Sequence, residues 1–296
     1  MNLQDLRYLV ALADCGHFGR AADSCHITQP TLSAQLKKLE AYLGVILFER
    51  TSRSLTVTSQ GAPILAKARE VVAAADALLE LARREGGVMS GPLQLGVIPT
   101  LGPYLLPTLL PLIAERFPKA RLVLQEDLTG NLLAALKAHR LDGALLALPL
   151  ADDDLACEAL FDEPFYFACA KSHGLAKTKT IDPAELADEK LLLLADGHCL
   201  REQTLAVCGQ IGARSDAADF RATSLETIRQ MVAAGLGATL LPALALSKDG
   251  LCIRPLKGPP YRRIGLVWRK SFPRQDDMQL LAKTIKAHLP EGVRGV

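Results

Sequence analysis

The sequence contains no uninterrupted run of about 18 apolar residues, the length that a membrane-spanning helix requires. Its first residues, MNLQDLRYLVALADCGHF, carry no basic segment, and Asp14 breaks their apolar run. Because a secretory signal needs both features, we expect no signal peptide. These absences predict a cytoplasmic protein with no membrane partner.

The sequence also lacks the cysteine and histidine spacings of a zinc site. Its seven cysteines are scattered, and none of them forms a Cys-x-x-Cys pair. We therefore expect no metal and no cofactor. In a reducing compartment such thiols stay free, so any disulfide would be transient and regulatory.

An excess of charge of one sign is missing as well. The chain has 34 Lys and Arg against 32 Asp and Glu, a net charge of +2 that neither indicates nor excludes a nucleic-acid partner. Its 296 residues are 49% hydrophobic, which predicts about two folded domains or more with ample core.

The first 58 residues predict three helices followed by a small β-wing. Apolar residues recur at helical spacing in 3–13, 18–25 and 29–43, and short strands are expected at 48–50 and 55–57. This order is the plan of a winged helix-turn-helix domain, whose third helix enters the major groove of DNA.

The candidate DNA contacts are short polar and basic side chains of the third helix and the wing. Polar groups on the helix can reach base edges, and arginines on the wing can meet phosphates or the minor groove. A plain three-helix domain with a solvated polar face is the alternative, because residues 1–60 hold six basic and five acidic residues. The candidates are Thr28, Gln29, Pro30, Thr31, Ser33, Gln35, Lys37, Lys38, Arg50, Ser52 and Arg53.

Two segments, FGRAADSCHITQPTLSAQLKKLEAYLGVILFER and LTVTSQG, resemble the N-terminal domain of LysR-type transcriptional regulators. The resemblance implies that the chain binds operator half-sites on double-stranded DNA. It also implies RNA polymerase as a partner.

Residues 59–88 predict a long helix that follows a capping Thr58 and ends at Gly86–Gly87. From Leu65 to Ala82, small and apolar residues alternate steps of three and four, which makes a seam of about three heptads. An amphipathic helix that packs on its own domain is the alternative. The resemblance implies a dimerisation helix and therefore a homodimer or homotetramer.

Residues 89–296 alternate strand and helix patterns, which predicts an α/β domain with largely parallel sheets. Since this is long for one sheet, we expect one lobe at about 89–162 and 267–296 and a second at about 163–266. The resemblance implies the same plan, two Rossmann-like lobes akin to periplasmic binding proteins. Ligands bind beyond the carboxyl ends of strands in such sheets, and the residues expected there are Thr100, Thr129 and the segment ADGHC at 195–199.

Two cysteines, Cys199 and Cys208, flank the helical pattern LREQTLAV. Nine steps of one helix separate their Cα atoms by roughly 13 Å and place the thiols on opposite faces. A disulfide needs Cα atoms within about 7 Å. The pair is therefore either two packing cysteines or a switch that must melt a helix to close.

The surroundings of Cys199 favour its thiolate form. The cysteine falls in the first turn of the predicted helix, where backbone N–H groups and the helix dipole favour an anion. His198 and Arg201 flank it, and Arg269 would approach if it ends a neighbouring strand; Asp196 opposes them.

Three further segments resemble the peroxide-sensing members of the LysR family: EKLLLLADGHCLREQTLAVC, FRATSLETIRQMVAAGLGATLLPALA and IGLVWR. The resemblance implies that Cys199 is the peroxidatic cysteine and Cys208 the resolving one. It implies hydrogen peroxide as the signal, a reductant of the glutaredoxin or thioredoxin type, and activation of oxidative-stress defence genes. The implied peroxide pocket contains Thr100, Thr129, His198, Arg201 and Arg269.

Two other functions fit part of the sequence. A LysR-type regulator with inert cysteines would sense a small metabolite in the cleft between the lobes. A thiol peroxidase would use Cys199 as its nucleophile, but the DNA-binding half argues against an enzyme.

Overall fold

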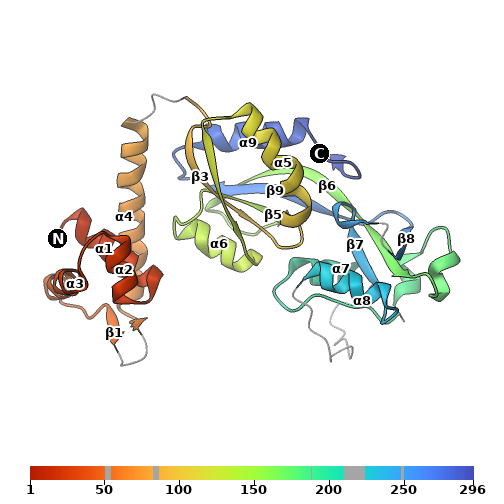
Figure 1. Ribbon diagram of the computed structural model, residues 1–296, viewed down its shortest axis with the longest axis horizontal. Helices are drawn as coiled ribbons and strands as arrows, with labels where there is room; N and C mark the ends of the chain where they lie inside the picture. Colours follow the sequence, from red (N-terminus) through yellow and green to blue (C-terminus); the bar gives the residue numbers. More distant parts are fainter. Residues whose placement is uncertain (51–54, 83–86, 188, 210–223, 248–249) are drawn as a thin grey trace. The chain divides into compact units, whose positions relative to one another are not determined.

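A computed structural model shows two compact units, Met1–Glu85 and Gly86–Val296 (Figure 1). No described helix has both the length and the apolar character to cross a membrane. The structure describes residues 1–50, 55–82, 87–187, 189–209, 224–247 and 250–296.

The first unit is a winged helix-turn-helix domain with a long helix attached, as predicted. Its helices are α1 (Leu3–Cys15), α2 (Phe18–Ser24), α3 (Gln29–Leu43) and α4 (Gly61–Ala82). The wing strands β1 (Phe48–Arg50) and β2 (Leu55–Val57) pair antiparallel.

Local sequence sets the ends of these helices. Asn2 forms a capping box with Asp5 at the start of α1, and Gly16 ends that helix in the left-handed conformation. Thr28 caps α3, whose second residue is Pro30. The three helices enclose a core that includes Leu9, Leu12, Leu32, Leu36 and Leu39.

The predicted seam of α4 divides into two parts. Ala68 is buried in the core of the first unit, and Leu65 and Val72 pack against that core. Arg7 and Arg69 also form ion pairs that join α1 to α4, with Asp76 and Asp14 respectively. Farther along the helix, Leu78 and Leu79 are exposed. The first half of the seam is therefore used within its own domain.

The second unit is an α/β domain with a curled mixed sheet. Its strand order is β10-β6-β9-β5-β3-β4, and β7 and β8 also pair with β6. The strands are β3 (Gly91–Val97), β4 (Ala120–Glu126), β5 (Gly143–Leu148), β6 (Leu155–Ala170), β7 (Thr239–Pro242), β8 (Leu251–Pro255), β9 (Tyr261–Arg269) and β10 (Arg294–Gly295). The helices are α5 (Gly102–Arg116), α6 (Thr129–Lys137), α7 (Cys199–Val207), α8 (Leu225–Ala233) and α9 (Gln275–Ala287).

The expectation of largely parallel sheets is wrong. Only β3 runs parallel to its neighbours β4 and β5 among the described strands, whereas β6 and β9 pair antiparallel with every partner. The reason is that β9 brings the chain back beside β5 in the opposite direction.

Strand β6 serves two hydrophobic cores. Its first part pairs with β9, and its last residues pair with β7 and β8. One core draws on residues between Met89 and Phe161 and again between Ile264 and Ile285. The other draws on residues between Phe165 and Leu256. We call these the first and second cores; the chain passes between them along β6 and returns along β9.

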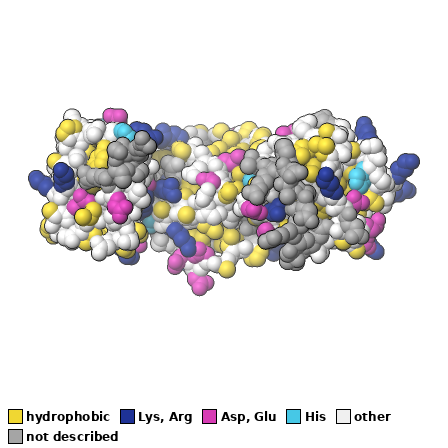
Figure 2. All heavy atoms as spheres, turned by 90° about the horizontal axis from the view of Figure 1, so that it is seen from below, with side chains coloured by type: hydrophobic (Ala, Val, Ile, Leu, Met, Phe, Trp, Pro, Cys, Tyr) yellow, Lys and Arg dark blue, Asp and Glu magenta, His cyan; other side chains and the backbone are white. Residues whose placement is uncertain are grey.

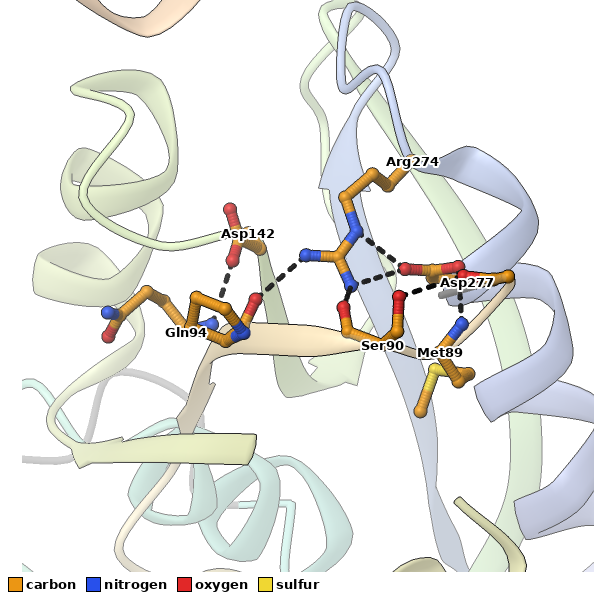
Figure 3. Close-up of polar contacts among 8 residues, drawn as sticks. Met89, Ser90, Gln94, Asp142, Arg274 and Asp277 are labelled. Atoms are coloured by element: carbon orange, nitrogen blue, oxygen red, sulfur yellow. Dashed lines mark hydrogen bonds and ion pairs between the residues drawn. The ribbon is translucent and has the colours of Figure 1, made fainter. Parts of the chain in front are cut away.

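A buried ion pair fixes the entry of the chain into the second unit (Figure 3). Arg274 donates from Nε to Asp277 Oδ2 at 2.6 Å and from Nη1 and Nη2 to the carbonyl oxygens of Pro92 and Ser90, each at 2.7 Å. The other oxygen of Asp277 accepts from the backbone N–H of Met89 at 2.9 Å. The start of β3 is therefore tied to the first turn of α9.

Asp277→Ala should destabilise the second unit by about 3–5 kcal/mol, because the substitution leaves a buried guanidinium without its charge partner. Urea unfolding followed by the fluorescence of Trp268 measures this, since the chain has one tryptophan and it is buried in this unit. The control is Lys257→Ala, which breaks an exposed pair with Asp182 and should cost about 0–1 kcal/mol. Equal effects of the two substitutions would contradict the structural role of Asp277.

Candidate functional site

The predicted helix between the two cysteines is present. Helix α7 begins at Cys199, His198 is its N-cap, and Cys208 is its C-cap. Cys199 is half-buried and Cys208 is buried, and both thiols are free. Since the helix separates their Cα atoms by roughly 13 Å, no disulfide can join them while α7 is folded.

The two thiols belong to different cores. Cys199 packs against the first core, whereas Cys208 is part of the second. Burial raises the pKa of Cys208 to about 11, so this thiol is protonated at neutral pH. The half-buried Cys199, at the helix N-terminus, is the better placed of the two to react with a solute.

The N-termini of α6 and α7 lie against each other. Thr129 is the first residue of α6, and its hydroxyl oxygen is buried without a hydrogen-bond partner among the described residues. Gly197, in the turn before Cys199, has φ of +93°, and a Cβ atom there would lie 3.0 Å from Cδ1 of Leu128. The turn that leads to Cys199 therefore abuts the residue before Thr129.

Thr100 is held by a buried arginine. Arg262 donates from Nη1 to the Thr100 hydroxyl at 2.8 Å and from Nη2 to the Thr100 carbonyl oxygen at 3.0 Å. Its Nε donates to Glu163 at 2.8 Å, and the second oxygen of Glu163 accepts from the backbone N–H of Leu244 at 2.9 Å. Arg262 and Glu163 are almost fully buried. The orientation of the Thr100 hydroxyl is thus fixed through two charged residues.

Sequence reasoning missed Arg262 and Glu163. The signal for Arg262 was the alternation along β9, which places it on the same face as Ile264 and Leu266, while the neighbouring Arg263 points the other way. Arg263 is accordingly more exposed and pairs with Asp162.

The expectation that Arg269 lies beside Cys199 is wrong. The Arg269 guanidinium donates to the carbonyl oxygens of Leu136 and Leu141, at the C-terminal end of α6, whereas Thr129 and the turn before Cys199 lie at its N-terminal end. The reason is topological, because β9 runs antiparallel to β5 and so ends at the opposite edge of the sheet from the carboxyl ends of β3 and β5.

His198 and Arg201 flank Cys199 as the sequence places them. His198 is buried, and burial lowers the pKa of its imidazole, so the ring is neutral at pH 7. The guanidinium of Arg201 pairs with Asp196 at 3.0 Å and donates to the carbonyl oxygen of Leu194 at 3.1 Å. Its charge therefore helps to hold the loop before α7.

A further polar cluster joins the two lobes. Tyr104 of α5 packs against the second core and hydrogen-bonds Arg229 of α8, which pairs with Glu226. Burial raises the pKa of Tyr104, so its hydroxyl stays protonated. The Nε of Arg229 is buried without a hydrogen-bond partner among the described residues.

The candidate DNA contacts on α3 lie on its exposed side. Thr28, Gln29, Pro30, Thr31, Lys37 and Lys38 are exposed, and Ser33 and Gln35 are partly exposed. Thr28 also caps the helix by accepting from the backbone N–H of Thr31. The side chain of Arg50 and the residues Ser52 and Arg53 lie outside the described part of the chain. Figure 2 shows basic and acidic side chains interspersed over the face in view, as the small net charge leads one to expect.

Two family descriptions match the chain. Residues 3–62 match the bacterial regulatory helix-turn-helix proteins of the lysR family, and residues 86–290 match the LysR substrate binding domain. Together they span both units described above.

Similar proteins cover nearly the whole chain. It is 48% identical over 294 residues to the hydrogen peroxide-inducible genes activator of Pectobacterium carotovorum subsp. carotovorum, covering 98% of this chain and 97% of that protein. It is also 48% identical to the DNA-binding transcriptional dual regulator OxyR of Escherichia coli K12, covering 98% and 96% respectively. Among solved structures, full-length OxyR C199D from Pseudomonas aeruginosa has a TM-score of 0.81 and 39% identity, covering 97% of this chain and 98% of that one.

Gly197→Ala should destabilise the second unit by about 1–3 kcal/mol, because alanine is strained at positive φ and its methyl group would press on Leu128. The change should also speed alkylation of Cys199, since the turn that leads into α7 is loosened. The control is Gly130→Ala in the first turn of α6, where a Cβ atom meets nothing within 4 Å. Urea unfolding and the alkylation rate of Cys199 are measured for both variants. If the two variants have the same stability and the same alkylation rate, the conformation of Gly197 does not control the stability of the turn or access to Cys199.

Proposed function

The chain belongs to the LysR family of bacterial transcriptional regulators, and on that premise we propose that it senses hydrogen peroxide through a reversible Cys199–Cys208 disulfide. The observation that carries the proposal is the position of Cys199. It is the first residue of α7, beside a second helix N-terminus that holds the unpartnered hydroxyl of Thr129, with a partner thiol at the far end of α7.

The site suits a small neutral oxidant. Hydrogen peroxide has no charge, so hydroxyl groups that donate and accept hydrogen bonds must orient it. Thr129 has a free hydroxyl, Arg262 fixes that of Thr100, and neutral His198 can donate or accept. The first turn of α7 offers backbone N–H groups to an anion that forms at Cys199.

The chemistry proceeds in two balanced steps. The Cys199 thiolate attacks one peroxide oxygen, the O–O bond breaks, and the sulfenic acid forms while hydroxide leaves and takes a proton to become water. The Cys208 thiol then condenses with the sulfenic acid, which forms the disulfide and a second water. A reductant of the glutaredoxin or thioredoxin class restores both thiols by thiol–disulfide exchange.

Closing the disulfide requires α7 to unfold. Leu200 and Leu205 are buried on this helix, and exposing each costs about 1.5–3 kcal/mol. The covalent bond holds the rearranged segment against that cost. The new surface around residues 200–208 then changes the contacts between subunits and, through them, the spacing of the DNA-binding domains.

The remaining assignments follow from the family. Residues 1–58 read operator half-sites with α3, residues 59–88 join two chains through the part of α4 where Leu78 and Leu79 are exposed, and residues 89–296 sense the signal. A cytoplasmic homodimer or homotetramer that engages RNA polymerase and activates oxidative-stress defence genes fits this arrangement. The chain is not an enzyme in this proposal, because one turnover is enough to signal.

A metabolite sensor with inert cysteines is the second candidate. The observation that favours it is the buried, unpartnered Nε of Arg229 between the lobes, which suits a carboxylate. This candidate predicts that Cys199→Ser keeps the response of the chain to its signal.

We expect Cys199→Ser to abolish the peroxide-dependent change in the DNA footprint, because no nucleophile remains. Cys208→Ser should accumulate a sulfenic acid that dimedone traps, without an intramolecular disulfide. The matched control is Cys157→Ser, an exposed cysteine that should leave the response unchanged. Footprinting with and without peroxide, combined with mass spectrometry, measures all three. A Cys199→Ser chain that still responds would contradict the proposal, and sustained peroxide consumption with excess reductant would indicate a peroxidase.

Hydrogen exchange tests the melting of α7. Amides of residues 200–208 should be protected in the reduced chain and lose that protection once the disulfide forms, because their helical hydrogen bonds are broken. The measurement compares both states of the full chain after mass spectrometry has verified the disulfide. Unchanged protection in a verified disulfide form would rule out a switch that works by unfolding the helix.

A further inference from the structure

A second pair of cysteines lies in the sheet of the second core. Cys169 in β6 and Cys252 in β8 are directly opposed in an antiparallel register, between the pairs Ala168–Ile253 and Ala170–Leu251. Directly opposed residues of antiparallel strands point to the same face of a sheet. Neither cysteine takes part in the switch proposed above.

The thiol of Cys169 contacts the opposed residue. Its Sγ atom lies 3.8 Å from the carbonyl oxygen of Cys252, and Cys252 packs against the core that contains Cys169. Cys252 Sγ also lies 3.3 Å from the carbonyl oxygen of Ala176, which accepts from Arg254 as well. Cys169 is fully buried, whereas Cys252 is partly exposed.

The backbone already has the spacing of a disulfide. Opposed residues of antiparallel strands have Cα atoms about 4.5–5.5 Å apart, and disulfides span Cα distances of about 4.4–6.8 Å. Rotation of two side chains would join the sulfurs. This is the opposite of the Cys199–Cys208 pair, which a folded helix holds apart.

We propose that Cys169 and Cys252 form a second oxidisable dithiol, which reacts with low-molecular-weight disulfides and closes as a cross-strand disulfide while the sheet stays folded. The partly exposed Cys252 thiolate attacks the disulfide RSSR and releases RS⁻, which leaves a mixed disulfide. The Cys169 thiolate then attacks the sulfur of Cys252 and releases the second RS⁻. The protein loses two electrons and two protons, and the small disulfide is reduced to two thiols.

This pair reacts more slowly than Cys199. Neither cysteine lies at a helix N-terminus, and burial raises the pKa of Cys169 to about 11, so little thiolate is available for the second step. The crosslink fastens the end of β6 to β8 inside the second core and leaves α7 untouched. It therefore marks prolonged thiol oxidation without operating the peroxide switch.

The test treats the folded full-length chain with oxidised glutathione, alkylates the remaining thiols at intervals, and maps linked peptides by mass spectrometry. We expect a Cys169–Cys252 peptide that appears at least about tenfold more slowly than peroxide generates the Cys199–Cys208 peptide. Hydrogen exchange in β6 and β8 should stay protected throughout.

Three variants separate the steps. Cys169→Ser should accumulate glutathione on Cys252, because the second thiol is missing. Cys252→Ser should leave Cys169 unmodified, because that thiol is inaccessible. Cys199→Ser should form the crosslink normally, which keeps this test independent of the peroxide proposal. The proposal is overturned if the folded chain yields no linked peptide after exposed Cys157 has reacted fully, or if linkage requires urea.

Discussion

Helix α7 holds the thiols of Cys199 and Cys208 apart, and this separation is the constraint on which the redox behaviour of the second unit depends. Helix α7 has nine residues, fewer than the roughly 12–15 that an isolated helix needs to be stable in water. Its stability therefore comes from packing, because Leu200 and the capping Cys208 lie in the second core, Leu205 is buried, and Cys199 packs against the first core. A helix held mainly by packing can unfold locally without the loss of either core.

The sheet of the second unit is built from strands that do not include α7, so unfolding of this helix leaves the strand pairing in place. Strand β6 contributes residues to both cores. Strand β9 pairs antiparallel with the first part of β6 along its entire length. Arg262 joins this frame to Thr100, and Arg274 joins α9 to the start of β3. Arg262, which orients the Thr100 hydroxyl, and Arg274, which fixes the start of β3, thus both lie outside α7.

Sequence reasoning recovered what local signals determine and missed what pairing determines. Neighbouring residues alone determine some features: the cap at Thr28, the left-handed Gly16, and the spacing of Cys199 from Cys208. The helices that these features predict are present. The direction of β9 relative to its neighbours cannot be predicted from its own residues, because the same alternating pattern fits a parallel or an antiparallel neighbour. Because of this ambiguity, sequence reasoning placed Arg269 at the wrong edge of the sheet and did not identify Arg262 as the residue that holds Thr100.

The two cysteine pairs show why spacing in the sequence is a poor guide to oxidation. Cys199 and Cys208 are near neighbours in the chain, yet a helix keeps them apart and turns their union into a conformational change. Cys169 and Cys252 are far apart in the chain, yet strand register places them face to face. A disulfide across the first pair must disrupt structure, and one across the second need not. Secondary structure between two thiols therefore decides whether their oxidation acts as a switch or as a crosslink.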